Sequence, residues 1–439
     1  MTHLERLREI DRRYRIFSEL NPSLSEEDLG EANLLFSAKD NLCTRDMQTR
    51  AGSAILDGYR PPFDATAIRR LREAGGILVG KTNMDEFGFG SFNTNSAYGV
   101  PRNPFDPERS CGGSSGGSAA AAALLEGHLA LGESTGGSIS CPAAYCGVVG
   151  LTPTYGRVSR YGLVDYANSL DKIGLLSRSG AQVAEYLQVI SGPDQQDPTS
   201  QVQPALQGGD VRSLAVPRGA LEGLDEKILD SFQGSVDRLR SLGMEVHWVE
   251  MPSLRFSLPA YYLLASCEVS TNLARYCGMR YGVQGDDISQ HYNDYFSQVR
   301  SAHLGKEAKR RVLLGTFSRM VGFRDRYYMK ALQVRQVVQD DYARVFRDHD
   351  LVLTPTMPMV APRFDEVEEM RPLDMYKADC LTVPANLTGL PHVSLPSDYL
   401  DGMPVGIHMV APRWHESSLV DAMLRWEEAF TYREPEVSL

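Results

Sequence analysis

The sequence lacks three features that would each define a class of protein. Its seven cysteines are scattered, without a Cys-x-x-Cys pair or a Cys/His cluster at zinc-ligand spacing, which excludes a disulfide framework and a structural zinc site. No run approaches the ~18 apolar residues of a membrane span, and the charged N-terminus is unlike a secretion signal. These absences predict a cytoplasmic protein with reduced thiols, no metal and no membrane association.

Positive charge is also scarce. The chain has 45 Lys and Arg against 56 Asp and Glu, a formal net charge of −11. This balance argues against a protein that binds nucleic acid unaided through its phosphates, and it leaves room for a basic partner that carries the nucleic acid. With 439 residues, 42% of them hydrophobic, the chain is long enough for one large domain or two to three ordinary ones.

Hydrophobic periodicity predicts an α/β protein. Residues 3–20 carry apolar side chains at helical spacing among charges, which indicates an amphipathic N-terminal helix. Strands and helices then alternate, as is typical of the α/β class. The expected strands are 34–38, 77–79, 129–132, 214–217, 245–249, 351–355, 393–396 and 405–410. The expected helices are 64–75 (with Asp64 as its cap), 118–126, 225–242, 258–277, 306–320, 325–347 and 416–430.

Two glycine-rich loops that contain serine are the most informative feature. Residues 111–118 read Cys-Gly-Gly-Ser-Ser-Gly-Gly-Ser, and residues 134–140 read Ser-Thr-Gly-Gly-Ser-Ile-Ser. Glycine lets the backbone approach a substrate and turn N–H groups toward developing negative charge, and serine there is a candidate nucleophile or proton relay. The intervening helix leaves by about 15 Å and the next strand returns by about 17 Å. Ser114 and Ser138 are therefore expected to meet.

A lysine, Lys39, ends the apolar run of residues 34–38. A lysine with two serines makes a base, a relay and a nucleophile without histidine, provided that the amine is neutral. Moving a lysine pKa from about 10.4 to near 7 costs about 4–5 kcal/mol, which burial supplies. A nearby Asp or Glu would undo that shift.

Three competing interpretations are set aside. Residues 75–82 fit the nucleotide-binding pattern G-x4-G-K-S/T, but the expected strand lies inside the motif and no strong helix follows it. Residues 112–116 fit the hydrolase elbow G-x-S-x-G, but the two prolines before them do not suit the central strand that the elbow needs. Glycine–serine runs are often flexible linkers, but these two lie between apolar elements.

The two serine loops at this spacing resemble those of the amidase signature family. Residues 156–174 resemble the A subunits of Glu-tRNA(Gln)/Asp-tRNA(Asn) amidotransferases rather than generic amidases. Shorter segments with the same resemblance are 64–66, 80–87, 258–262, 309–311, 314–316 and 384–391. The resemblance covers nearly the whole chain.

The resemblance implies an amidase signature fold, in which a central mixed β-sheet is covered by helices on both faces. It implies one domain over residues 1–439, with a peripheral helix over 1–20 and a core over about 30–180. A helical insertion over about 255–350 is expected to cover the substrate.

The resemblance also assigns roles to individual residues. Ser138 corresponds to the nucleophile, Ser114 to the serine that follows a cis peptide bond, and Lys39 to the base. The residues whose backbone amides correspond to the oxyanion hole are Thr135, Gly136, Gly137 and Ser138. The residues that correspond to the free-glutamine site are Tyr262, Arg311 and Asp379, with Tyr261 and Arg310 as adjacent alternatives.

The implied function is glutamine hydrolysis within a tRNA-dependent amidotransferase. Ammonia would convert Glu-tRNA(Gln) to Gln-tRNA(Gln), Asp-tRNA(Asn) to Asn-tRNA(Asn), or both. The implied partners are the B and C subunits of the amidotransferase, with the mischarged tRNA held mainly by the B subunit. ATP and Mg are expected at the partner, and this chain is expected to need no cofactor. The alternatives are a stand-alone amidase acting on small amides and a non-enzymatic assembly subunit with a degenerate site.

The second loop departs from the family pattern. The family usually has Ser-Asp-Thr-Gly-Gly-Ser-Ile-Arg-Gln where this chain has Glu133-Ser-Thr-Gly-Gly-Ser-Ile-Ser-Cys141. Ser134 and Ser140 replace an Asp and an Arg, so the loop loses one charge of each sign. The substitutions affect how the loop is braced and leave the nucleophile in place.

Overall fold

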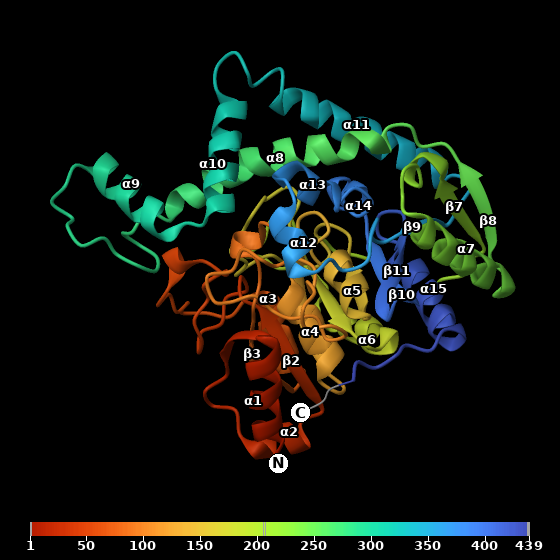
Figure 1. The fold of residues 1–439 in the computed structure, drawn as a ribbon, viewed down its shortest axis with the longest axis horizontal. Helices are drawn as coiled ribbons and strands as arrows, with labels where there is room; N and C mark the ends of the chain where they lie inside the picture. Colours follow the sequence, from red (N-terminus) through yellow and green to blue (C-terminus); the bar gives the residue numbers. More distant parts are fainter. Residues whose placement is uncertain (1, 205, 207, 437–439) are drawn as a thin grey trace.

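One mixed sheet of eleven strands runs through the part of the chain that the computed structural model describes, residues 2–204, 206 and 208–436 (Figure 1). Its strand order is β1-β3-β2-β4-β6-β5-β10-β11-β9-β7-β8. The strands are β1 Phe17–Leu20, β2 Leu34–Lys39, β3 Gly76–Thr82, β4 Leu129–Ser134, β5 Val149–Thr152, β6 Lys172–Ser177, β7 Ser213–Pro217, β8 Glu245–Val249, β9 Leu351–Pro355, β10 His392–Leu400 and β11 Met403–Val410.

Helices cover both faces of this sheet. Side chains of β4 alternate between the faces: Leu129 and Leu131 pack with α3, α6 and α15, whereas Ala130 packs with α4 and α5. The helices are α1 His3–Tyr14, α2 Glu26–Glu31, α3 Thr66–Glu73, α4 Gly116–Leu124, α5 Ser140–Cys146, α6 Gly180–Ile190, α7 Glu226–Ser241, α8 Ser257–Asn272, α9 Tyr292–His303, α10 Lys306–Arg319, α11 Tyr328–Val345, α12 Phe364–Glu369, α13 Pro372–Lys377, α14 Val383–Leu387 and α15 Glu416–Ala429. The expected α/β class, with a mixed sheet between two layers of helices, is confirmed.

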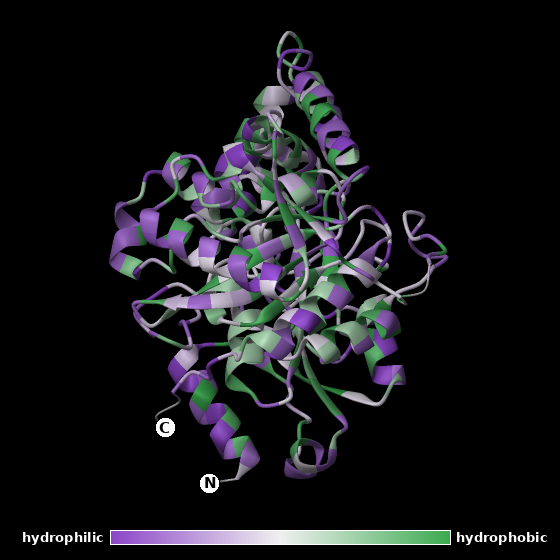
Figure 2. Ribbon diagram, turned by 90° about the vertical axis from the view of Figure 1, so that its right-hand side faces the viewer, coloured by the Kyte–Doolittle hydropathy of each residue, from purple (hydrophilic) through white to green (hydrophobic). Residues whose placement is uncertain are grey.

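The N-terminal helix is shorter than the expected 3–20. It ends at Tyr14, where Arg15 adopts a left-handed conformation with φ 52° and its N–H donates to the Asp11 carbonyl. Residues 17–20 instead form β1, an antiparallel edge strand on β3. Figure 2 shows hydrophilic and hydrophobic residues alternating along the helix next to the N-terminus. Both Ile16 and Phe17 are buried in the same hydrophobic cluster.

A smaller correction concerns the start of α3. The expected cap, Asp64, lies outside the helix, and the N-cap residue is Ala65 without a side-chain hydrogen bond. Asp64 accepts from the Arg45 N–H at 2.9 Å and from Arg72 Nη1 at 3.0 Å. The carboxylate therefore joins neighbouring segments instead of capping the helix.

The helix that carries the first serine loop, α4, is built almost entirely from small residues and is buried throughout. At Gly117, a Cβ atom would lie 2.5 Å from the carbonyl oxygens of both Asn83 and Ile16. Only a residue without a side chain allows this approach. Small residues thus let α4 sit directly against the sheet and its neighbouring turns.

The helices α8 to α11 lie between β8 and β9 in the chain, and they form the upper layer in Figure 1. α8 packs against both α10 and α11. That they cover a substrate stays a prediction, as does the single domain over 1–439, whose ends at residues 1 and 437–439 lie outside the described residues. No helix in the described part of the chain is long and apolar enough to span a bilayer.

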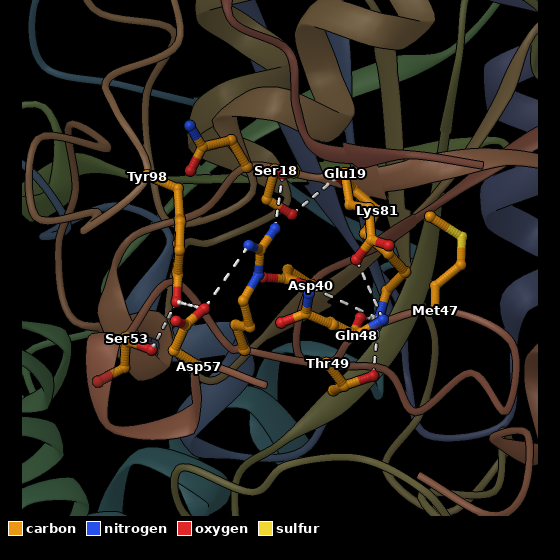
Figure 3. Close-up of polar contacts among 12 residues, drawn as sticks. Ser18, Glu19, Asp40, Met47, Gln48, Thr49, Ser53, Asp57, Lys81 and Tyr98 are labelled. Carbon is orange, nitrogen blue, oxygen red and sulfur yellow. Dashed lines mark hydrogen bonds and ion pairs between the residues drawn. The ribbon is translucent and has the colours of Figure 1, made fainter. Parts of the chain in front are cut away.

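The strand predicted at 77–79 is present as β3, which extends to Thr82 and so includes Lys81, the lysine of the rejected nucleotide-binding motif. It is buried, and its amine donates to the Leu42 carbonyl at 2.7 Å and to Thr49 Oγ1 at 2.9 Å. It also pairs with Asp40 Oδ1 at 3.6 Å (Figure 3). Lys81 therefore ties the segment after β2 to β3.

We expect Lys81→Met to lower the free energy of unfolding by about 3–5 kcal/mol, because it leaves a buried carboxylate short of a partner. Among the described residues, the remaining charged partner of Asp40 would be Arg50, at 4.0 Å. Urea denaturation followed by circular dichroism measures the change. Lys330→Met, at an exposed position on α11, is the control and should change stability by under about 0.5 kcal/mol. A loss below about 1 kcal/mol for Lys81→Met would contradict this role.

Candidate active site

The candidate site lies where two parallel strands end. β2 and β4 are parallel neighbours, and Lys39 and Ser134 are their last residues. The carboxyl ends of parallel strands meet at one edge of a sheet, which is where α/β proteins commonly bind ligands. Lys39 therefore lies next to the loop that leaves β4.

Lys39 is fully buried and has three close neighbours. Its amine lies 2.7 Å from Ser114 Oγ, 2.8 Å from the Glu133 carbonyl oxygen and 2.9 Å from Glu133 Oε2. Burial lowers the pKa of the Lys39 amine, and the Glu133 carboxylate opposes that shift. The expected contact between the base and the first serine loop is present, together with an acidic neighbour that the sequence analysis did not place there.

The two serine loops meet, as predicted from the lengths of the helix and strand between them, while a direct contact between Ser114 and Ser138 stays a prediction. The Ser115 N–H donates to the Ser138 carbonyl at 3.2 Å, and the peptide bond between Gly113 and Ser114 is cis. Lys39 and Ser114 have no exposed surface, whereas Ser138 is 6% exposed. Of the three residues, Ser138 alone can meet a substrate that arrives from outside.

The glycines of the second loop allow close packing by other segments. A Cβ atom on Gly136 would lie 2.9 Å from the Tyr261 hydroxyl, and one on Gly137 would lie 2.4 Å from Thr382 Oγ1 and 3.2 Å from Asp379 Oδ1. The backbone of residues 135–138 thus faces α8 and the segment before α14. An oxyanion hole formed by the amides of Thr135, Gly136, Gly137 and Ser138 stays a prediction.

The three expected glutamine-site residues cluster beside this loop. The Tyr262 hydroxyl donates to Asp379 Oδ2 at 3.0 Å, and Ser91 Oγ donates to the same oxygen at 2.8 Å. The Arg311 guanidinium lies 5.1 Å from the centre of the Tyr262 ring. Burial raises the pKa of Asp379, while the two hydroxyl donors and Arg311 lower it.

Of the two adjacent arginines, the geometry favours Arg311. Its side chain is 3% exposed and pairs with Glu307 Oε1 at 2.9 Å, whereas the Arg310 side chain is 42% exposed. Aromatic rings of Phe89, Tyr166, Tyr262 and Tyr376 surround the Arg311 guanidinium. Burial gives Arg311 a fixed position, which a residue that orients a substrate needs.

Sequence reasoning missed three groups at the site. Tyr261, considered only as an alternative to Tyr262, packs over Gly136. Asp85 accepts from the N–H groups of Asn93 and Asn95, both at 2.9 Å, and burial raises its pKa to about 7. Glu133 contacts Lys39 directly. The sequence did contain one indication of Glu133, because an acidic residue stands there at the end of an apolar strand and the family pattern has serine at that position.

Ser134 and Ser140, which stand where the family pattern has an Asp and an Arg, make neutral contacts. Ser134 Oγ donates to the Gly136 carbonyl at 3.4 Å, and Ser140 Oγ lies 3.1 Å from His392 Nδ1. His392 is buried and next to His408, and burial lowers the pKa of both imidazoles. Hydroxyl groups and neutral rings therefore occupy the places where the family pattern has an Asp and an Arg.

No group of three or more His, Cys, Asp or Glu side chains in the described residues is arranged to hold a metal ion. That the chain needs no cofactor stays a prediction. The groups that meet at this edge of the sheet are the lysine, the two serines, the carboxyl groups and the backbone amides described above.

Comparisons with known proteins agree with this arrangement. The family model described as Amidase matches residues 14–420. The A subunit of the glutamyl-tRNA(Gln) amidotransferase of Haloarcula marismortui is 45% identical over 397 residues, covering 88% of this chain and 93% of that protein.

Two solved structures show the same fold. The crystal structure of the glutamyl-tRNA(Gln) amidotransferase A subunit from Thermotoga maritima superimposes with a TM-score of 0.85 at 33% identity, covering 99% of this chain and 93% of that chain. The peptide amidase of Stenotrophomonas maltophilia gives a TM-score of 0.79 at 28% identity, with coverages of 99% and 93%.

We expect Gly137→Ala to lower the rate of amide hydrolysis at least about 100-fold, because the added methyl group displaces the loop and small displacements at a reacting centre have effects of that size. Steady-state kinetics measure the rate, and circular dichroism checks the fold. Gly234→Ala, at a position on α7 with open space around it, is the matched control. A Gly137→Ala enzyme with unchanged kinetics would show that the loop backbone is not part of the site.

Proposed function

The chain belongs to the amidase signature family, and we propose that it is the glutamine-hydrolysing subunit of a tRNA-dependent amidotransferase. It releases ammonia from glutamine for the conversion of Glu-tRNA(Gln) to Gln-tRNA(Gln), Asp-tRNA(Asn) to Asn-tRNA(Asn), or both. The observation that carries the proposal is the buried 2.7 Å contact between Lys39 and Ser114, beside a loop that presents Ser138. The similarity to two named A subunits supports the choice of reaction.

The proposed mechanism uses a Ser-Ser-Lys triad. Ser138 attacks the side-chain amide carbon of glutamine, and its proton passes through Ser114 to the neutral amine of Lys39. The backbone N–H groups of residues 135–138 stabilise the oxyanion. The proton returns through Ser114 to the departing nitrogen, which leaves as ammonia. Water then hydrolyses the glutamyl ester on Ser138, and the same relay accepts and returns a proton.

Glutamine recognition is assigned to the cluster beside the loop. Asp379 carries a carboxylate for the α-amino group, and Arg311 carries a guanidinium for the α-carboxylate. The Tyr262 hydroxyl, 3.0 Å from Asp379 Oδ2, keeps that carboxylate in position. One acidic and one basic side chain match a free amino acid, which carries a charge of each sign. A small neutral amide would not need either of them.

The remaining chemistry is assigned to partners. We place ATP, Mg and most of the tRNA contact on the B subunit, with the C subunit completing a cytoplasmic complex, and propose no cofactor for this chain. Its net charge of −11 fits a protein that leaves phosphate binding to another. Purification of the chain with its partners, followed by tRNA-dependent amidation, tests this division.

A stand-alone amidase is the second candidate, favoured by the likeness to a peptide amidase at 28% identity. The purified single chain would then hydrolyse varied small amides without partners or tRNA. Fast turnover of such amides, with glutamine no better than the rest, would replace the amidotransferase assignment.

We expect Ser138→Ala, purified with the B and C subunits, to lose glutamine hydrolysis by at least about 10³-fold, because it lacks the nucleophile. Ammonium chloride should restore tRNA amidation, because the partner site is intact. Glutaminase and amidation assays with each nitrogen source measure the two effects. Near-normal glutamine turnover by this variant would contradict the proposed mechanism.

We expect Arg311→Lys to raise the KM for glutamine about 10- to 100-fold, because a charge-assisted contact contributes about 1.5–3 kcal/mol and lysine does not reproduce the guanidinium geometry. Arg310→Lys, at the exposed neighbouring position, is the matched control and should leave KM within about twofold. The assignment would be wrong if the two variants behaved in the opposite way.

A further inference from the structure

Glu133 is the residue at the site that neither the family pattern nor the proposed mechanism explains. It is the penultimate residue of β4, and its side chain is 1% exposed. Glu133 Oε2 accepts from Lys39 Nζ at 2.9 Å and from Asn41 Nδ2 at 3.2 Å, and Glu133 Oε1 lies 2.8 Å from Thr135 Oγ1. The family pattern has a small serine at this position.

An ionised Glu133 would oppose catalysis. A carboxylate 2.9 Å from the amine stabilises the ammonium form of Lys39, and an ammonium group cannot accept the proton of the nucleophile. Burial already lowers the pKa of Lys39 against this effect, and a neutral carboxyl group would remove the opposition while the amine waits for a substrate.

The hydrogen bonds around Thr135 indicate where the extra proton lies. Thr135 Oγ1 is 2.8 Å from Glu133 Oε1 and 2.9 Å from Asp171 Oδ1. A hydroxyl group has one hydrogen to donate, so both contacts are full hydrogen bonds only when one of the two carboxyl groups is protonated and donates to Thr135. Both Asp171 oxygens already accept from backbone N–H groups of Tyr166 and Ala167, at 2.8 to 3.0 Å. Asp171 is therefore the acceptor, and Glu133 is the donor.

The hydrogen-bond donors and acceptors around Lys39 also match a neutral amine. A neutral amine has two hydrogens and one lone pair. In this form the Glu133 carbonyl oxygen and Glu133 Oε2, at 2.8 and 2.9 Å, would accept the two hydrogens, and the lone pair would face Ser114 Oγ at 2.7 Å. A neutral Lys39, the form that can accept a proton, thus satisfies all three contacts.

We propose that Glu133 is a positioning residue that carries a proton in the resting enzyme, shared through Thr135 with Asp171, and so keeps Lys39 neutral. The inference rests on the proposed function for its catalytic meaning. When Lys39 accepts the proton of Ser138 through Ser114, the single negative charge on the two carboxyl groups stabilises the transient ammonium. That proton then leaves with ammonia, so the carboxyl groups hold the same one proton before and after each step.

The two carboxyl groups share one buried site, in which ionisation of one disfavours ionisation of the other. Burial first and the neighbouring Glu133 second raise the pKa of Asp171, as expected for two carboxyl groups in one buried site. Among the described residues, Lys39 on β2 contacts Glu133, and Arg160, Asp165 and Tyr155 before β6 interact electrostatically with Asp171. Asp85 after β3 acts on Lys39.

Kinetics of two variants in the complex with the B and C subunits test the proposal. We expect Glu133→Ala to lower kcat for glutamine at least about 10-fold with KM unchanged, because Lys39 and Thr135 lose a partner. Glu133→Gln should restore kcat to within about threefold, because an amide, like a protonated carboxyl, both donates and accepts. The acid limb of its pH–rate profile should stay within about half a pH unit of that of the native enzyme, because no charge has been removed.

An ionised Glu133 predicts a different outcome. Removing a carboxylate next to Lys39 would lower the pKa of the amine, and the acid limb in Glu133→Gln would move down by at least about one pH unit. That shift would overturn the proposal, and so would equal activity of Glu133→Ala and the native enzyme.

Infrared spectroscopy gives a readout that needs no turnover. We expect the native-minus-Glu133→Gln difference spectrum at pH 8 to contain the C=O stretch of a protonated carboxyl group. A difference spectrum with only carboxylate bands would refute the protonated Glu133. If the native complex failed to hydrolyse glutamine, the proposed function would fall, while this spectrum would still decide where the proton lies.

Discussion

The buried contact between Lys39 and Ser114 is the interaction on which the candidate site depends. It requires β2 and β4 to be parallel neighbours, because only then do Lys39 and the second loop lie at the same edge of the sheet. It requires α4 to lie tightly against the sheet, because Ser114 comes just before that helix. It also requires burial, since a solvated lysine stays charged at neutral pH. Sheet order, helix packing and catalysis are therefore linked through one side chain.

Sequence patterns predicted the α/β class because strands and helices here have clear hydrophobic periods. They were wrong over residues 17–20, where a short edge strand follows the helix and both Ile16 and Phe17 are buried. Four residues are too few for a strand period to stand out against the preceding helical pattern. The pairing of β1 with β3, a contact distant in sequence, decides the structure of this segment.

The site was predictable where its residues belong to local motifs. The two serine loops and Lys39 could be identified in this way, and so could the cis bond before Ser114. The link from Thr135 to Asp171 could not, because it depends on the antiparallel pairing of β4 with β6, and no strand was expected at β6. Glu133 was visible in the sequence, but its meaning depends on a distance to Lys39 that only the fold supplies.

Two adjacent residues of opposite charge have a consequence for how the chain folds. Lys39 contacts Glu133, and Asp40 contacts Lys81. If β2 slipped by one residue in one direction, a carboxylate would take the place of Lys39 beside Glu133. A slip in the other direction would bring Lys39 next to Lys81. Either misalignment would bury two side chains of the same kind together, carboxyl with carboxyl or amine with amine, and would separate each from its native partner. The order of Lys39 and Asp40 in the sequence therefore favours the native register of β2.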